Sequence, residues 1–323
     1  MKRLGFSIAA IAVVGAVIVW RVISNVDASM PTFEPIVVEA QAPKPTFDSA
    51  KAFDHLKAMV AIGPRYSGSP AIRQTRAYLT RELSALGFKV EEQPFTADTP
   101  KGKIEMVNLI VRLAGKRPER LLFTGHYDTK NLPNFVGASD GGSSAAFLVE
   151  LARALKDQPR EFTYEFVWLD GEEATCNLWD ECSKPGKPDH TYGSQYYVDA
   201  AKQAGALKSI KAMILVDMIG DKDLQIRRER KGTAWITDAI WAAAKRTGHG
   251  GTFVDLSTDI EDDHVPFINA GVEAADIIDL DYPYWHNDQA CCDDISRVSA
   301  RSLQIVGEVL LAAIPDIEKR LAR

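Results

Sequence analysis

Residues 162–173 constrain the fold more than any other stretch, because an apolar segment there runs directly into acidic residues. The first eight residues, FTYEFVWL, place large side chains at alternate positions with mostly apolar residues between them. A strand covered on both faces has this pattern, so the segment is predicted to be a central strand of a sheet. Asp170, Glu172 and Glu173 follow it. Three carboxylates this close repel one another unless a cation or a shared proton offsets their charge.

An acidic group of this kind in isolation is more often a solvated turn than a site. The rest of the chain decides between these two interpretations, because other acids and histidines also follow predicted strands. The composition permits a large folded core, since 46% of the 323 residues are hydrophobic and 25% are charged. The net charge of -6 argues against nucleic acid as the main partner.

The N-terminus, residues 1–26, is predicted to be an export signal. Two basic residues precede the uncharged, largely apolar residues 4–20, and Arg21 follows them. The run is longer than the core of a usual signal peptide, and the small-residue pattern at 26–28 lies beyond Arg21. These features favour an uncleaved membrane anchor over a cleaved signal peptide. With either, the bulk of the protein is expected outside the cytoplasm, on the periplasmic or secreted side.

Residues 27–47 contain four prolines without helical or strand periodicity and are predicted to be an extended linker. Residues 48–323 are predicted to be one catalytic domain. Strand-like and helix-like segments alternate through it, which predicts an α/β fold: a doubly wound, mostly parallel sheet with helices on both faces. The expected strands are residues 88–95, 104–113, 120–124, 162–169, 211–216 and 272–280, with a further strand from Leu224, and the expected helices are 48–60, 69–86, 139–155, 192–204, 234–244 and 299–313.

Metal-binding types of side chain follow several of these strands. In a doubly wound sheet, ligands bind at the carboxyl ends of the strands, so residues placed there are expected to meet. The six residues that fall just after a strand or at the start of the following helix are His126, Asp140, Glu172, Glu173, Asp217 and His286. Imidazole nitrogen combined with carboxylate oxygen suits zinc better than calcium. Three protein ligands would leave a coordination position open, as in catalytic zinc sites.

Five short motifs, in order, resemble those of the M28 zinc aminopeptidase family, which includes the glutaminyl-peptide cyclotransferases. The motifs are GHYDTK, GASDGG, LDGEE, ILVDMIG and YWH, and the resemblance covers residues 53–313. It implies a zinc-exopeptidase-like fold. Position by position, it implies that Asp140, Glu173 and His286 bind the main zinc ion and that Glu172 is the general acid/base. His126 and Asp217 match the ligands of a second ion in the peptidases.

Two features are similar to the cyclotransferase branch in particular. One is the pair of acids Asp262 and Asp263, directly before a histidine. The other is the pair of tryptophans Trp179 and Trp285, which resemble the walls of a pocket for a small amide side chain. We therefore expect cyclisation of an N-terminal glutamine to pyroglutamate with release of ammonia, one zinc ion, and Asp217 and Asp262 positioning the proton that Glu172 transfers.

Other residues favour the alternative, an M28-type aminopeptidase that hydrolyses N-terminal residues with two metal ions. The segment 140–143, DGGS, looks more like the peptidases, and Glu261 stands where cyclotransferases tend to carry an amide. For either enzyme the expected substrates are peptide or protein N-termini, and the chain is expected to be a monomer. A non-catalytic ectodomain is a third possibility, but it would be marked by loss of Glu172 or of a ligand, and none is lost.

The remaining histidines and the cysteines carry weaker predictions. His55, His190 and His249 are expected at the surface, and His264 is expected to order the loop of Asp262 rather than to bind metal. The basic run 227–231 is expected to be a solvated turn. In an exported protein the four cysteines favour disulfides, but their pairing stays open. These cysteines are Cys176, Cys182, Cys291 and Cys292.

Overall fold

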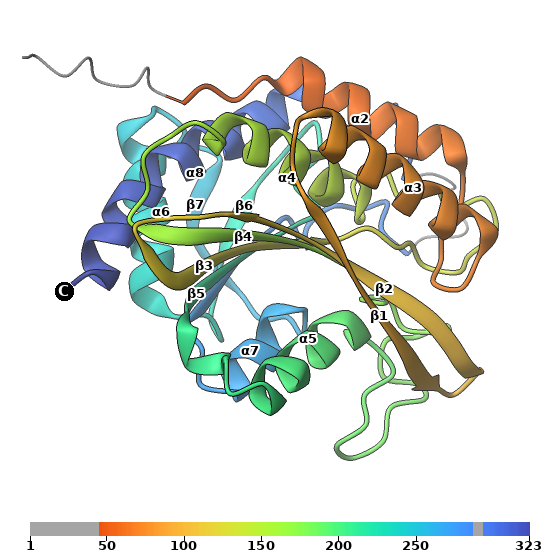
Figure 1. Cartoon of the computed structure of the whole chain (residues 1–323). Helices are drawn as coiled ribbons and strands as arrows, with labels where there is room; N and C mark the ends of the chain where they lie inside the picture. The colour runs from red at the N-terminus through yellow and green to blue at the C-terminus, as the bar shows by residue number, and fades with distance from the viewer. Residues whose placement is uncertain (1–44, 287–292) are drawn as a thin grey trace, which may run out of the picture. The chain divides into compact units, whose positions relative to one another are not determined.

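A six-stranded sheet forms the centre of the structure, a computed structural model that describes residues 45–286 and 293–323 (Figure 1). Across the sheet the strands are ordered β1-β2-β4-β3-β5-β8. The strands are β1 (Val90–Thr99), β2 (Gly102–Leu113), β3 (Arg117–His126), β4 (Phe162–Leu169), β5 (Ile210–Asp217) and β8 (Ala274–Ile278). As predicted, the first two form an antiparallel pair at one edge, whereas β4, β3, β5 and β8 are parallel neighbours.

Strand β4 is the interior strand that its sequence predicts. It pairs with β2 on one side and with β3 on the other, and all but one of its residues are buried. Trp168 is completely buried, and its indole nitrogen donates to the carbonyl of Ala145 at 2.9 Å. Because β4, β3 and β5 are parallel, their carboxyl ends meet at one edge of the sheet, which is where α/β proteins bind ligands.

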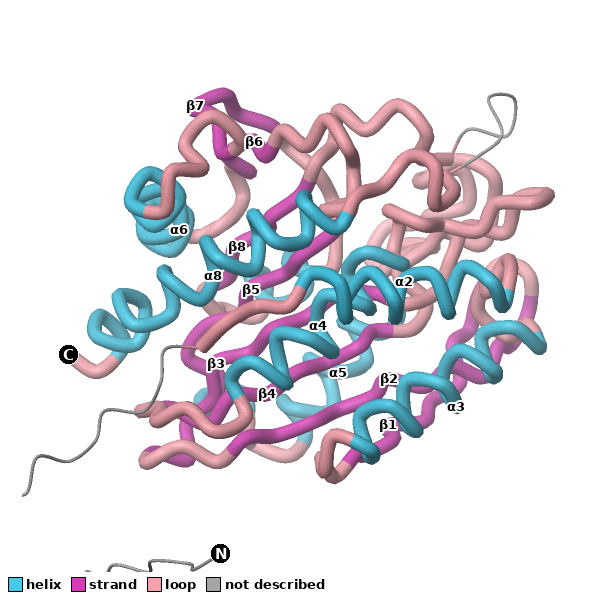
Figure 2. Tube along the Cα trace, turned by 90° about the horizontal axis from the view of Figure 1, so that it is seen from above, coloured by secondary structure: helices cyan, strands magenta, loops and turns pink. Residues whose placement is uncertain are grey.

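Helices cover both faces of the sheet, which confirms the predicted doubly wound arrangement (Figure 2). The helices are α2 (Ser49–Ile62), α3 (Pro70–Ala85), α4 (Gly142–Leu155), α5 (Tyr192–Gln203), α6 (Ala234–Arg246), α7 (His264–Asn269) and α8 (Ala300–Leu321). The helices α2, α3, α4, α6 and α8 contribute to the larger hydrophobic core on one face, and α5 and α7 pack on the other face. Helix α8 extends past the predicted end at residue 313, through Pro315.

The basic run at residues 227–231 begins as a strand, so the prediction of a solvated turn was wrong. The strands of a second, two-stranded sheet are β6 (Ile226–Glu229) and β7 (Phe253–Thr258). Arg228 lies 2.9 Å from a carboxylate oxygen of Asp238 and 3.0 Å from one of Asp255. Acids on neighbouring elements therefore offset the basic charge, and the run itself does not encode their positions.

The folded region begins earlier than the predicted boundary at residue 48. Phe47, the last residue of the expected linker, is 5% exposed and stacks on Phe147 with 4.9 Å between ring centroids. Its ring lies so close to Gly307 of α8 that a Cβ atom there would come within 2.3 Å of it. Phe47 is therefore part of the core rather than of a linker.

Several predictions fall on residues that the structure does not describe. These are the N-terminal anchor at residues 1–26, most of the linker, and both Cys291 and Cys292. Within the described ranges, no helix combines the length and apolarity needed to span a bilayer. Cys176 and Cys182 are described, and they form a disulfide.

Candidate active site

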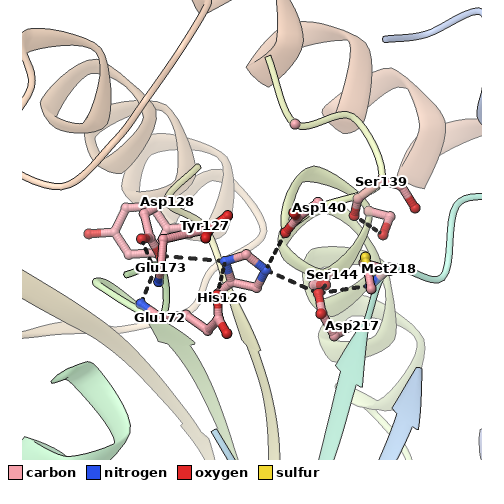
Figure 3. A network of polar contacts seen from close by, with 12 residues as sticks. His126, Tyr127, Asp128, Ser139, Asp140, Ser144, Glu172, Glu173, Asp217 and Met218 are labelled. Atoms are coloured by element: carbon pink, nitrogen blue, oxygen red, sulfur yellow. Dashed lines mark hydrogen bonds and ion pairs between the residues drawn. The ribbon is translucent and has the colours of Figure 1, made fainter. Parts of the chain in front are cut away.

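Acidic and imidazole side chains gather at the carboxyl ends of the parallel strands (Figure 3). His126 is the last residue of β3, Asp217 is the last residue of β5, and Glu172 and Glu173 follow shortly after β4. All four side chains are buried. Sheet topology thus joins residues that are far apart in sequence, since His126 and Asp217 are separated by 91 positions.

His126 lies between two groups of carboxylates. Its Nε2 is 3.0 Å from Oδ1 of Asp217 and 3.2 Å from Oδ1 of Asp140. Its Nδ1 is 3.4 Å from Oδ1 of Asp128 and 3.8 Å from Oε2 of Glu172. Burial would lower the pKa of His126, but the charges of Asp217 and Glu172 raise it well above its usual range. A protonated His126 therefore offsets part of the surrounding negative charge.

Asp140, Glu173 and His286 form a second convergence. The Nε2 of His286 is 2.9 Å from Oε2 of Glu173 and 3.3 Å from Oδ2 of Asp140. One candidate ligand atom from each residue lies within 4.8 Å of the other two. These two carboxylate oxygens are buried and accept no well-oriented hydrogen bond from any described residue, since Nε2 of His286 instead bonds Oε1 of Glu173 at 3.0 Å. Buried oxygens without donors, next to an imidazole nitrogen, fit a divalent cation such as zinc.

Asp140 is shared between this group and a neighbouring one. His126, Asp140 and Asp217 also place their candidate ligand atoms within 4.8 Å of one another. Asp140 directs one oxygen toward each histidine. Burial opposes its ionisation, but the imidazoles of His126 and His286 beside it hold the pKa of Asp140 below its usual range. The geometry therefore permits either one ion or two adjacent ions.

Two carboxyl groups next to these ligand groups bind protons more tightly than usual. Burial raises the pKa of Glu172 well above its usual range; His126 opposes this rise, and the charges of Asp262 and Glu173 reinforce it. The pKa of Asp262 is raised in the same direction, first by burial and then by Asp217. A carboxyl group whose pKa moves toward neutrality can both accept and return a proton.

The backbone next to two of these residues adopts an unusual conformation. Met218, directly after Asp217, has a φ of 46°, and His286 has a φ of 45°. Residues other than glycine rarely adopt positive φ values, and such strain persists where the surrounding structure enforces it. The amide of Met218 donates to Oδ1 of Asp217 at 2.8 Å, so the turn holds that carboxylate in place.

Asp128 is a residue whose part in the site was not predicted. It is completely buried, and its two oxygens accept hydrogen bonds from the backbone amides of Glu172, at 3.2 Å, and Glu173, at 3.3 Å. Asp128 therefore fixes the turn that carries both acids. It belongs to the GHYDTK motif, two positions after His126, and this position was the available signal.

Arg65 and Asp293 were also not predicted, and both hold the loop before Asp140. Arg65 is completely buried and donates to the carbonyls of Val136, at 2.5 Å, and Gly137, at 2.7 Å. Burial lowers the pKa of Arg65 to about 10, against the acids around it. Asp293 accepts from the backbone amide of Asp140 at 2.8 Å. No sequence pattern marks either residue.

A cavity of about 200 Å³ opens beside the acids. Asp140, Glu172 and Asp262 line it together with the two tryptophans predicted to form its walls, Trp179 and Trp285. Asp217 and His286 line the same cavity. The structure therefore brings the predicted substrate-binding residues to the predicted proton-transfer residues.

The prediction for the three isolated histidines was wrong for His190. It is only 6% exposed, and its ring stacks on Trp179 with 4.2 Å between ring centroids. His55 and His249 are half-buried, and each makes a side-chain hydrogen bond. Polar side chains in loops or on amphipathic helices look exposed in a sequence, but packing of distant segments decides their burial.

His264 begins helix α7 and is completely buried. Its Nε2 is 3.1 Å from Oε2 of Glu229, and its Nδ1 is 3.7 Å from Oδ2 of Asp276. The loop of Asp262 directly precedes it. His264 thus ties this loop to β6 and β8, in keeping with the ordering role expected for it.

The chain was compared with known proteins. Residues 108–314, more than half of the chain, match peptidase family M28. The chain belongs to this family. Among solved structures, a glutaminyl cyclase from an Acidobacteriales bacterium is 37% identical. The alignment covers 87% of this chain and 98% of that one, with a TM-score of 0.78.

Two further relatives carry different names. A leucine aminopeptidase precursor from Bacteroides thetaiotaomicron is 27% identical, with coverage of 84% of this chain and 98% of the other and a TM-score of 0.77. The glutaminyl-peptide cyclotransferase-like protein of Bos taurus is 27% identical over 280 residues, which are 77% of this chain and 71% of that protein. These likenesses confirm the predicted zinc-exopeptidase-like fold and the resemblance to the cyclotransferase branch of the M28 family.

Proposed function

We propose that the chain is a zinc-dependent glutaminyl-peptide cyclotransferase, which converts an N-terminal glutamine of a peptide or protein to pyroglutamate and releases ammonia. The cavity of about 200 Å³ carries this proposal, because Trp179, Trp285, Glu172 and Asp262 all line it. A cavity of this size is smaller than a usual drug-sized ligand site and suits one short side chain. The 37% identity to a glutaminyl cyclase supports the same conclusion.

Asp140, Glu173 and His286 would hold the zinc ion. Their convergence within 4.8 Å and the two carboxylate oxygens that lack hydrogen-bond donors support this assignment. A bound zinc ion would polarise the γ-carbonyl group of the substrate glutamine. Three ligands from the protein would leave room for that carbonyl.

Glu172 would transfer the proton. As the α-amino nitrogen bonds to the γ-carbonyl carbon, it loses a proton, and Glu172 accepts it. The bond from that carbon to the amide nitrogen then breaks, and Glu172 returns the proton to the departing ammonia. The reaction consumes no water. The raised pKa of Glu172 suits a group that must both take and give a proton.

Asp217 and Asp262 would keep Glu172 in position. A proton held by one of these two carboxyl groups would limit the negative charge of the site. Two ionised carboxylates close together repel each other, and a proton on one of them lowers this repulsion. The raised pKa of Asp262 makes it the carrier of that proton. Asp217 accepts hydrogen bonds from the Met218 amide at 2.8 Å and from Ser144 Oγ at 3.3 Å, which fix its position.

We propose one zinc ion per chain. The 37% identity to a glutaminyl cyclase supports this count, because a single ion is what the resemblance to the cyclotransferase branch implies. His126 and Asp217, whose Nε2 and Oδ1 are 3.0 Å apart, would then have a structural part.

The second candidate is an M28-type aminopeptidase that uses two ions. The convergence of His126, Asp140 and Asp217 within 4.8 Å favours it, and so does the similarity to the leucine aminopeptidase precursor. In that enzyme Glu172 would take a proton from an attacking water, and the products would be a free amino acid and a shortened peptide.

An assay of the purified protein with a glutaminyl and a leucyl reporter peptide of otherwise identical sequence separates the two functions. A cyclotransferase releases ammonia and leaves a peptide that is lighter by one ammonia, whereas an aminopeptidase releases the first amino acid. The Glu172→Gln variant is the control for contaminating enzymes. Release of leucine without any pyroglutamate product would reject the cyclotransferase.

The proposed setting of the enzyme is extracytoplasmic. We propose that residues 1–26 are a signal anchor or signal peptide, that most of residues 27–47 is a linker, and that the rest is the catalytic domain, acting as a monomer on peptide N-termini. The disulfide between Cys176 and Cys182 supports this location, because disulfides persist in oxidising compartments. Fractionation of cells that express the full chain, with and without residues 1–26, tests the anchor.

A further inference from the structure

We infer that His190 is a positioning residue, whose ring holds Trp179 in place as one wall of the substrate cavity. This inference rests on the proposed function, because it assigns to His190 a share in substrate binding. The two rings stack with 4.2 Å between centroids and 20° between planes. Trp179 lines the cavity, and His190 is 6% exposed. The histidine therefore lies against the tryptophan that meets the substrate.

His190 belongs to a segment that is bonded directly to the acidic turn. The next two amides in the chain, those of Thr191 and Tyr192, donate to the carbonyls of Glu172 and Gly171, both at 2.7 Å. Thr191 has a φ of 52°, an enforced conformation for a residue with a branched side chain. The backbone that carries the His190 ring is thus fixed relative to Glu172.

Trp179, in contrast, stands on a long loop over residues 174–189, the excursion below the tip of the β1–β2 hairpin in Figure 1. Its sequence neighbours Leu178 and Asp180 are largely exposed, with 71% exposure for Leu178 and 74% for the side chain of Asp180. Asp180 nevertheless brings Oδ1 to within 3.7 Å of Nε2 of His190, beside the stack. The stack on His190 joins Trp179 to the fixed part of the site.

A disulfide and buried hydrogen bonds restrain the loop. The disulfide between Cys176 and Cys182, which are six positions apart, closes a short segment of the chain, and Trp179 lies in this segment. Asp189 is 1% exposed and accepts from Thr175 Oγ1 at 2.6 Å and from the Cys176 amide at 2.9 Å. These restraints bring the indole near His190, and the face-to-face stack then sets its orientation.

The aromatic character of His190 explains the stack better than its charge does. Burial lowers its pKa, against the opposing effect of Asp180, so the ring is neutral near pH 7. A neutral ring stacks on an indole through its face, and such aromatic pairs change an equilibrium by about two- to tenfold. We therefore expect loss of the ring to raise KM by about three- to tenfold while kcat stays within about twofold.

A double-mutant cycle on the full protein tests the inference. His190→Ala should raise KM for the glutaminyl reporter, whereas His190→Phe, which keeps a ring, should keep KM near that of the wild type. In a Trp179→Ala background, His190→Ala should have no further effect on KM, because the wall that it positions is absent. Zinc content should stay unchanged throughout. The matched control is His249→Ala, since His249 is half-buried and hydrogen-bonds Glu308 at 2.7 Å.

A second pair of variants and a fluorescence measurement test the role of His190 even if the alanine variant does not fold. If the alanine variant does not fold, the comparison is made between His190→Leu and His190→Phe, which differ in the ring more than in apolar character. Acrylamide quenching of tryptophan fluorescence should increase on loss of the ring. Equal KM values for His190→Ala and the wild type, or additive effects in the cycle, would overturn the inference. A wild type that does not cyclise the reporter would instead reject the proposed function, and the quenching comparison would still decide the role of His190.

Discussion

The two parts of the candidate active site are built in different ways. Glu172, Glu173, Asp217 and His126 stand at or just beyond the ends of β3, β4 and β5, are buried, and are held by backbone and side-chain hydrogen bonds. The tryptophans of the cavity stand on loops instead. Trp179 is half-buried within the segment closed by the disulfide, and Trp285 is half-buried directly before His286.

The strand-end residues would thus carry out the chemical step, and the loop tryptophans would bind the substrate. A carboxylate at a strand end has a position set by the whole sheet, so its geometry is insensitive to local changes. A tryptophan on a loop can be moved by a few substitutions without disturbing the sheet. We therefore expect changes among the strand-end acids to abolish turnover, and changes in the loop walls to alter mainly substrate affinity. The following predictions test that division, from the largest effect to the smallest.

Removal of the metal should have the largest effect. Chelation should abolish activity, because Asp140, Glu173 and His286 would lose the ion that polarises the substrate. Added zinc should restore activity, whereas calcium should not, because calcium prefers oxygen ligands alone. The measurement is ammonia release before chelation, after it, and after each addition. Full activity in protein shown by elemental analysis to be metal-free would reject the site.

Substitution of the two adjacent glutamates should separate proton transfer from metal binding. Glu172→Gln should lower kcat by about a hundredfold or more, because the amide cannot carry the proton, while the zinc content stays the same. Glu173→Gln is the matched variant in the same turn and should lose both zinc and activity. Elemental analysis beside kcat checks both. Zinc loss in the Glu172 variant would show that the roles are assigned the wrong way round.

The sequence was sufficient to predict the residues at the carboxyl ends of the strands. Alternating apolar residues identify β4, and acids that follow strands must meet once the strands are parallel neighbours. The same logic brought His126 to Asp217 and Glu172. These inferences need only the spacing of apolar residues and the rule that the carboxyl ends of parallel strands meet at one edge of the sheet. A single sequence is therefore enough to make them.

The supporting residues could not be predicted in this way. Asp293 binds the amide of Asp140 from 153 positions away, and Arg65 meets the carbonyl of Gly137 from 72 positions away. Neither contact follows from a period or a motif, because each depends on how two irregular segments pack. His190 was placed at the surface for the same reason. Loops carry no period, so their contacts appear only in the folded chain.

Substitution of a loop tryptophan should have a smaller effect, confined to the affinity for substrate. Trp285→Ala removes an apolar wall of the cavity and should raise KM by about tenfold, with kcat and zinc content nearly unchanged. Trp235, a half-buried tryptophan on α6 that does not line this cavity, provides the control. Steady-state kinetics on the glutaminyl reporter measures the difference. A drop in kcat without a change in KM would mean that Trp285 contributes to the chemical step rather than to substrate binding.

The smallest effect is expected from His126→Gln, although His126 lies at the centre of the acids. The glutamine amide can donate to Asp217 much as Nε2 of His126 does at 3.0 Å. If this contact is structural, the variant keeps one zinc ion per chain and loses less than about tenfold in activity, of the order of one weakened hydrogen bond. If His126 instead binds a second ion, the wild type holds two ions, the variant holds one, and activity falls far more. Elemental analysis of both proteins separates these cases. Two ions in the wild type and one in the variant would turn the assignment to the aminopeptidase, because the strand-end acids would then share two cations and Asp262 would have no need of a proton.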